Sequence, residues 1–139
     1  MADLKELVAA ELENLEQVLA ALPPAGGLSG LSVLELAGAA TLLSSFYNGV
    51  ENILKQALKA RAIVLPTGEA WHRDLLQLAC QHAIIRPATR DALASYLAFR
   101  HFITHAYGFD LDPERIQPLL EKVRQIFDEL KTDLNPLIR

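Results

Sequence analysis

Apolar residues recur every three or four positions through most of this chain, and that spacing restricts its fold more than any other feature. Stretches of this kind cover residues 3–22, residues 33–60 and the segment after Pro113. This spacing predicts amphipathic helices, and no stretch alternates apolar and polar residues as a half-buried strand does. We therefore predict an all-α fold, an antiparallel bundle of about five helices in one domain over residues 1–139.

Capping and breaking residues set the expected helix boundaries. Ser32 and Glu35 form a capping box, in which each side chain satisfies a free backbone N–H at a helix start. Arg86-Pro87 is expected to close the third helical region, Thr89 to cap the fourth helix, and Asp112-Pro113 to begin the fifth. The expected helices cover residues 3–22, 33–60, 69–82, the segment from Thr89 to Gly108, and the segment from Pro113.

Charge is distributed unevenly along the chain. The net charge is −4, but residues 55–105 carry seven basic and three acidic residues, a net of +4, and contain all four histidines. Residues 1–54 carry a net of −6 and residues 106–139 a net of −2. A localised positive zone can bind phosphates on an otherwise acidic protein, although a solvated helical surface also explains it.

The N-terminal segment and the single cysteine bear on location. The first residues carry acids from Asp3 onward, whereas a secretory signal needs a basic start and an unbroken apolar run. No uncharged apolar stretch reaches the length of a membrane span. Cys80 is the only cysteine, so an internal disulfide and a cysteine-based zinc site are excluded. We expect a cytoplasmic protein with no membrane association.

An unusual cluster of polar residues lies at the end of the fourth helical stretch. Arg100, His105 and Tyr107 follow one another at a spacing of R-x4-H-x-Y, and Gly108 then stops the helix. On a straight helix Arg100 and His105 are separated by about 140°. These side chains therefore converge only if the helix distorts near Ile103–Thr104, or if a second copy of the chain completes the site.

This motif and its flanks resemble the HEPN superfamily of helical ribonucleases, and most closely its HepT-like toxins. The segments FYNGVENILKQAL, LPTGEAWHRDLL and YLAFRHFITHAYGFDLD are all similar to that branch. The resemblance covers residues 36–130. It implies a homodimer, metal-independent RNA cleavage without a cofactor, and a type VII-like toxin–antitoxin pair. The implied partner is an MNT-type nucleotidyltransferase antitoxin that transfers AMP to the motif tyrosine, here Tyr107.

The chemistry of the motif residues agrees with RNA cleavage through the 2′-hydroxyl. Histidine titrates near neutrality, so we assign His105 as general base or acid. Arginine grips phosphate oxygens in a planar fork, so we assign Arg100 as the phosphate and transition-state clamp. One imidazole does not readily make both proton transfers, and a two-fold dimer would supply the second. A nucleotide on Tyr107 would add bulk and negative charge where RNA must bind.

Other residues and alternatives remain open at this point. We expect supporting or RNA-contacting roles for His101 and Thr104 within the motif and for His72 and Arg73 in the third helix, with Trp71 as a core anchor. His101 and His105 are four residues apart, but no nearby carboxylate or cysteine completes a metal site, so none is predicted. The main alternative is a catalytically silent HEPN bundle that binds a nucleotide or a partner.

Overall fold

The computed structural model describes residues 3–105 and 111–139, and in this part every regular element is helical. In chain order the elements are α1 (Leu4–Ala21), the 3-10 helix η1 (Ala25–Gly30), α2 (Val33–Ala60), α3 (Trp71–Gln81), α4 (Pro87–His105) and α5 (Pro113–Ile138). The described elements thus confirm the predicted all-helical fold. None of the helices in these ranges is long and apolar enough to cross a membrane.

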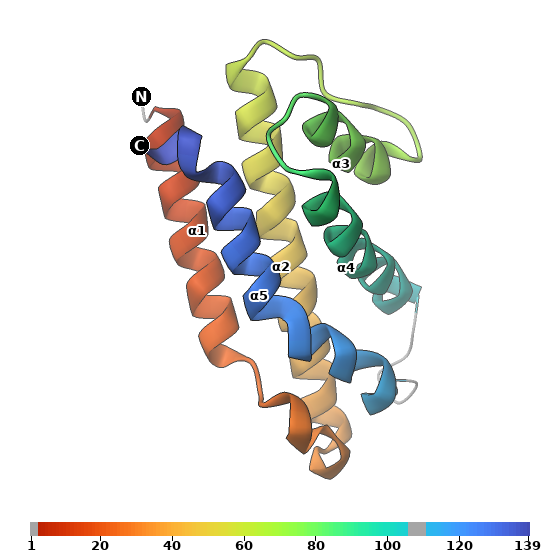
Figure 1. Ribbon diagram of the computed structural model, residues 1–139. Coiled ribbons are helices and arrows are strands. Elements are labelled where there is room, and N and C mark those ends of the chain that lie inside the picture. The colour runs from red at the N-terminus through yellow and green to blue at the C-terminus, as the bar shows by residue number, and fades with distance from the viewer. Residues whose placement is uncertain (1–2, 106–110) are drawn as a thin grey trace.

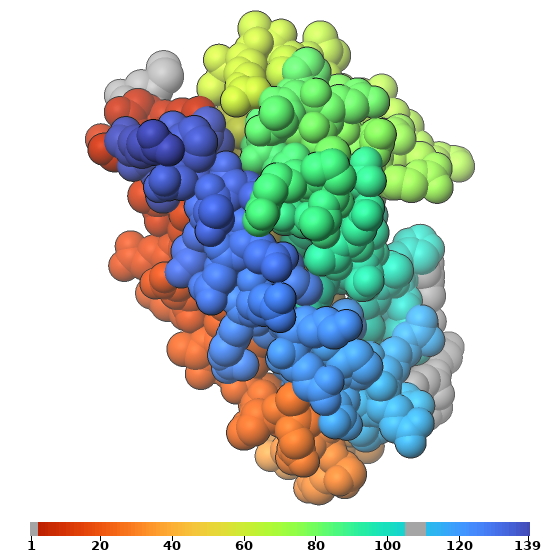
Figure 2. All heavy atoms as spheres, viewed as in Figure 1, coloured from red at the N-terminus to blue at the C-terminus, as the bar shows by residue number. Residues whose placement is uncertain are grey.

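Helix α2 is the centre of the bundle, and each of the other α-helices packs against it. Figure 1 shows that α1 and α4 run antiparallel to α2, while α5 runs alongside α2 in the same direction. The short α3 lies beside the C-terminal half of α2 and next to the start of α4 (Figure 1). Most of α2 is covered by the other helices in the space-filling view (Figure 2). The burial of α2 is nevertheless uneven, since Asn48 is exposed whereas Glu51 is buried.

One apolar core joins all of these elements. Phe46 of α2 is fully buried and makes edge-on ring contacts with Tyr96 of α4 and Phe127 of α5, at centroid distances of 5.6 and 6.4 Å. At Gly49 a β-carbon would lie 2.5 Å from Leu15 Cδ2, so the missing side chain lets α1 approach α2 closely. The helices are therefore held by close packing of an apolar face, which stabilises a bundle more than helix propensity does.

The predicted helix boundaries that fall in the described residues lie close to those of the structure, and the predicted cap that is wrong is at the start of α4; Gly108, the predicted end of this helix, lies outside the described residues. The Ser32–Glu35 capping box and the Asp112 cap are both present. Thr89 is not the cap that we predicted, because α4 already begins at Pro87, where a fixed φ and a missing N–H suit the first helical position. Thr89 is instead buried inside the first turn, and no described residue makes a hydrogen bond with its hydroxyl.

Candidate functional site

Arg100 lies on α4 where this helix faces α2, and its guanidinium is held by side chains of α2. Its Nη1 donates to Asn48 Oδ1 at 2.7 Å and to Glu51 Oε1 at 3.0 Å. The Arg100 side chain is only 19% exposed and that of Glu51 only 4%. A charge-assisted pair at the edge of the core fixes both side chains, because neither charge can be left there unpaired at low cost.

His72, from the first turn of α3, completes this network. Its Nδ1 lies 2.7 Å from Glu51 Oε2, and its Nε2 lies 3.0 Å from Arg100 Nη2. A neutral imidazole with its proton on Nδ1 satisfies both contacts, since it then donates to the carboxylate and accepts from the guanidinium. Three helices are thereby joined through one buried carboxylate, and the two oxygens of Glu51 each have a different cationic or donor partner.

The floor of this network is the buried ring of Tyr47. The Tyr47 ring is completely buried and lies 5.8 Å from the Arg100 guanidinium carbon. Burial raises the pKa of the Tyr47 phenol far above its ordinary value, and the negative charge of Glu51 raises it further. The buried Tyr47 ring lowers the local dielectric constant, which strengthens the electrostatic contact between Arg100 and Glu51. The guanidinium is therefore held in one orientation.

Trp71 supports His72 from the side. The two rings stack with centroids 3.6 Å apart, and the ammonium of Lys55 lies 4.3 Å from the centroid of the Trp71 ring. Trp71 is partly buried and packs against the core, so it anchors α3 at the edge of the core. The stack limits rotation of the imidazole and so maintains its contacts with Glu51 and Arg100.

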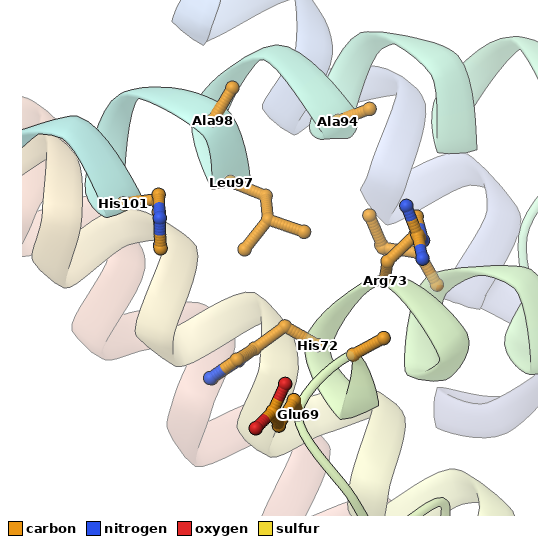
Figure 3. Close-up of a pocket in the computed structure, with 9 residues that line it drawn as sticks. Glu69, His72, Arg73, Ala94, Leu97, Ala98 and His101 are labelled. Carbon is orange, nitrogen blue, oxygen red and sulfur yellow. The ribbon is translucent and has the colours of Figure 1, made fainter.

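A pocket of about 470 Å³ opens between α3 and α4 next to this network. Ala94, Leu97, Ala98 and His101 of α4 form one wall, and Arg73 of α3 belongs to the opposite one (Figure 3). His72 also lines this pocket, so it contacts the buried network and the pocket at once. The pocket has the volume of a small-ligand site, with an apolar wall and several cationic or titratable side chains at its rim.

The position of His105 on α4 follows from the helix, whereas its side chain lies outside the described residues, as does Tyr107. Helix α4 continues without interruption to His105, so the distortion near Ile103–Thr104 that we considered is absent. Residue 105 is one turn beyond His101 and therefore on the face of α4 that forms the pocket wall. Arg100 is on a different face, which turns toward α2.

The other residues predicted for the site lie in different surroundings. His101 and Arg73 both line the pocket, whereas the Thr104 hydroxyl donates to the His101 carbonyl oxygen at 2.7 Å within the helix. No group of three or more His, Cys, Asp or Glu side chains in residues 3–105 and 111–139 is placed to bind a metal ion.

Sequence reasoning missed Glu51 and Asn48, the α2 side chains that hold Arg100. Glu51 lies between the buried Val50 and Ile53, so it is a charged residue in an apolar stripe. Such a residue needs a buried partner of opposite charge, and this signal was available in the sequence. Nothing local identified Arg100 as that partner, because the two residues are 49 positions apart.

The comparisons with known proteins agree with the resemblance seen in the sequence. The family model described as HepT-like protein matches residues 38–139, which include every residue of the network and the whole R-x4-H-x-Y motif. Comparison with curated proteins and with solved structures finds no match. Because the matched segment covers most of the chain and contains both the helical bundle and the motif, the protein belongs to the HepT-like family.

Proposed function

We propose that this protein is a metal-independent endoribonuclease and the toxin of a HEPN/MNT toxin–antitoxin pair. Membership of the HepT-like family supports this proposal at the level of the fold and the motif. The observation that carries it furthest is the network at Arg100, in which a guanidinium is fixed by a buried carboxylate and contacts His72, a residue that lines the α3–α4 pocket. An arginine oriented in this way is prepared to receive a phosphate without further reorganisation.

Arg100 retains the hydrogen-bonding capacity that phosphate binding requires. A guanidinium carries five N–H groups. The Nη1 group is used by Asn48 and Glu51 and part of Nη2 by His72, and no described residue accepts from Nε. The free donors can grip phosphate oxygens and stabilise the extra negative charge that develops on phosphorus during attack by the 2′-hydroxyl.

The proposed proton-transfer group is His105, and we place the RNA strand along the α3–α4 pocket. In a regular helix residues 100 and 105 face different directions, which supports a composite site formed by two copies of the chain. Arg100 of one copy would then act together with His105 of the other. The single domain proposed for residues 1–139 would be the repeating unit of this homodimer.

Cleavage is expected to continue in EDTA and to leave 2′,3′-cyclic phosphate ends. The proposed groups are an imidazole and a guanidinium, and the nucleophile is the substrate's own 2′-hydroxyl, so no metal-bound water is required. Gel analysis of a labelled single-stranded RNA, with enzymatic identification of the ends, measures both properties. DNA of the same sequence should remain intact because it lacks the 2′-hydroxyl.

The control for this assay is an identically purified His105→Ala protein, which reports any contaminating nuclease. Loss of cleavage on chelation, with recovery on adding a divalent cation, would contradict the proposed mechanism. Products that carry 5′-phosphate ends would contradict it as well, because they arise from attack by water and not by the 2′-hydroxyl.

We further propose that the partner nucleotidyltransferase inactivates the protein by joining AMP to Tyr107. The two other tyrosines support this choice by exclusion, since Tyr47 and Tyr96 are buried in the core. The Tyr96 hydroxyl also donates to the Leu119 carbonyl oxygen at 2.7 Å. Burial raises the pKa of both phenols far above the ordinary value, so neither can readily form a phenolate nucleophile.

Incubation with an MNT nucleotidyltransferase and ATP is expected to add one AMP to each chain and to stop cleavage. Peptide mass spectrometry should locate the adduct on the fragment that contains Tyr107, and Tyr107→Phe should prevent it. Tyr96→Phe is the matched control and should leave the modification unchanged. An adduct on another residue, or full nuclease activity of the modified protein, would refute the proposed regulation.

A further inference from the structure

A second pocket, of about 450 Å³, lies on the other side of Trp71 from the α3–α4 pocket. Its lining includes Lys55 and Lys59 of α2, the loop from Leu65 to Gly68, and Trp71 itself. None of the described residues that line this pocket is acidic. A concave site with two ammonium groups and no carboxylate has the electrostatic character of an anion site.

The two lysines differ in how firmly they are held. Lys55 is partly buried and its ammonium is fixed over the Trp71 ring at 4.3 Å. Lys59 is one helical turn further along the same face, is exposed, and forms no ion pair with a described residue. The pocket therefore combines one cation that is held over an aromatic ring with one exposed cation that forms no ion pair with a described carboxylate.

This pocket is connected directly to the proposed cleavage site. Trp71 forms part of its wall, and the stacked ring of His72 forms part of the α3–α4 pocket. His72 in turn contacts Arg100 at 3.0 Å. Contacts through Trp71 and His72 thus link the Lys55–Lys59 pocket to Arg100, while the α3–α4 pocket itself is lined by Arg73 and by the acidic Glu69.

We propose that the Lys55–Lys59 pocket binds a backbone phosphate of the RNA strand away from the cleaved bond. The inference rests on the proposed ribonuclease function, since it assigns a subsite to that substrate. Trp71 is covered by Lys55 on one face and His72 on the other, so the pocket offers charge and leaves no aromatic face for base stacking. Binding there should therefore depend on strand length and salt and be indifferent to base sequence.

The test measures binding of fluorescent single-stranded RNA by His105→Ala protein with and without Lys59→Gln. For RNA of about ten nucleotides, which spans several phosphates, we expect roughly fivefold weaker binding at low salt. The slope of log K against log salt should fall by about 0.7, the value for losing one phosphate contact on a single strand. For a dinucleotide, which reaches only the cleavage site, affinity should be unchanged. Lys55→Gln should act similarly.

Lys122→Gln is the matched control, because it removes the same charge from an exposed position on α5. If Lys59→Gln and Lys122→Gln weaken RNA binding equally, the loss reflects net charge alone and not the pocket. That result would overturn the proposal. Titration with inorganic phosphate and with AMP forms a separate arm. If phosphate or AMP binds saturably and this binding requires Lys59, while Lys59→Gln leaves RNA affinity unchanged, the pocket is a site for a free phosphate ligand. That result would overturn the RNA subsite.

Failure of the subsite and failure of the ribonuclease proposal can be told apart, because RNA binding and RNA cleavage are measured in separate assays. If the unmodified protein shows no nuclease activity but Lys59→Gln weakens binding of the longer RNA as expected, the ribonuclease proposal fails and the phosphate subsite stands. If the protein cleaves RNA and Lys59→Gln changes neither affinity nor salt slope, the subsite fails alone. Lys59 is exposed and forms no ion pair with a described residue, so its substitution is expected to leave the bundle intact.

Discussion

His105→Ala is expected to abolish RNA cleavage while leaving the helical fold and most of the RNA affinity unchanged. General acid–base catalysis by a positioned side chain contributes about 100-fold to 10,000-fold, and removing it should bring the rate close to background. His105 is the last residue of α4, and a single substitution at a helix end disturbs few backbone hydrogen bonds of the bundle. Single-turnover cleavage, circular dichroism and RNA binding measure the three properties. His82→Ala, at the exposed C-terminal end of α3, is the matched control.

Mixing two inactive proteins tests whether the site is shared between two copies. A heterodimer of one chain lacking Arg100 and one lacking His105 contains one intact pair if the pair is formed across the dimer. Random exchange of subunits should then restore about a quarter of the normal activity. Sedimentation should show twice the 15.3 kDa mass of the chain. If activity stays absent although subunit exchange has been demonstrated, Arg100 and His105 of each site belong to the same chain. A monomer in sedimentation would exclude the shared site.

Arg100→Ala is expected to abolish cleavage and also to destabilise the fold. The substitution leaves Glu51, whose side chain is 4% exposed, without its strongest partner. Breaking a buried ion pair by removing one member costs about 3–5 kcal/mol of unfolding free energy, because a buried charge remains uncompensated. His72 and its 2.7 Å contact with Glu51 reduce this cost. Denaturant unfolding followed by circular dichroism measures the loss.

A second substitution separates the structural role of Arg100 from its proposed catalytic role. Glu51→Gln in the Arg100→Ala protein removes the stranded charge, so stability should largely return while cleavage stays absent. Arg100→Lys should likewise regain stability, but an ammonium does not reproduce the planar fork and should restore little activity. Activity in the stable double variant would show that Arg100 serves only to hold the bundle and would contradict its proposed role in catalysis.

His72 acts on Arg100 in this interpretation as a positioning residue. His72→Gln offers an amide N–H to Glu51 and an amide oxygen to Arg100, so it can retain both contacts of the imidazole. It should therefore preserve much more activity than His72→Ala in the same assay. If both variants are equally inactive, the imidazole itself takes part in proton transfer.

The sequence predicted the elements well because their signals are local. Spacing of apolar residues identified the long helices, and the capping box at Ser32–Glu35 placed the start of α2. The misplaced start of α4 also has a local cause, since Thr89 and Pro87 are both suitable for the first turn of a helix. Thr89 is buried there, and burial depends on the neighbouring helices and not on the residue itself.

By itself, the sequence determined the helical class, the positive middle segment and the R-x4-H-x-Y motif, all of which depend on residues close together in the chain. Only the tertiary structure decided the partners of Arg100, because Asn48, Glu51 and His72 come from two other helices. It also placed Lys55 over the ring of Trp71, and both residues line the same pocket. Such contacts depend on how helices pack, and helix packing follows from the shape of whole apolar faces, which no short sequence pattern encodes.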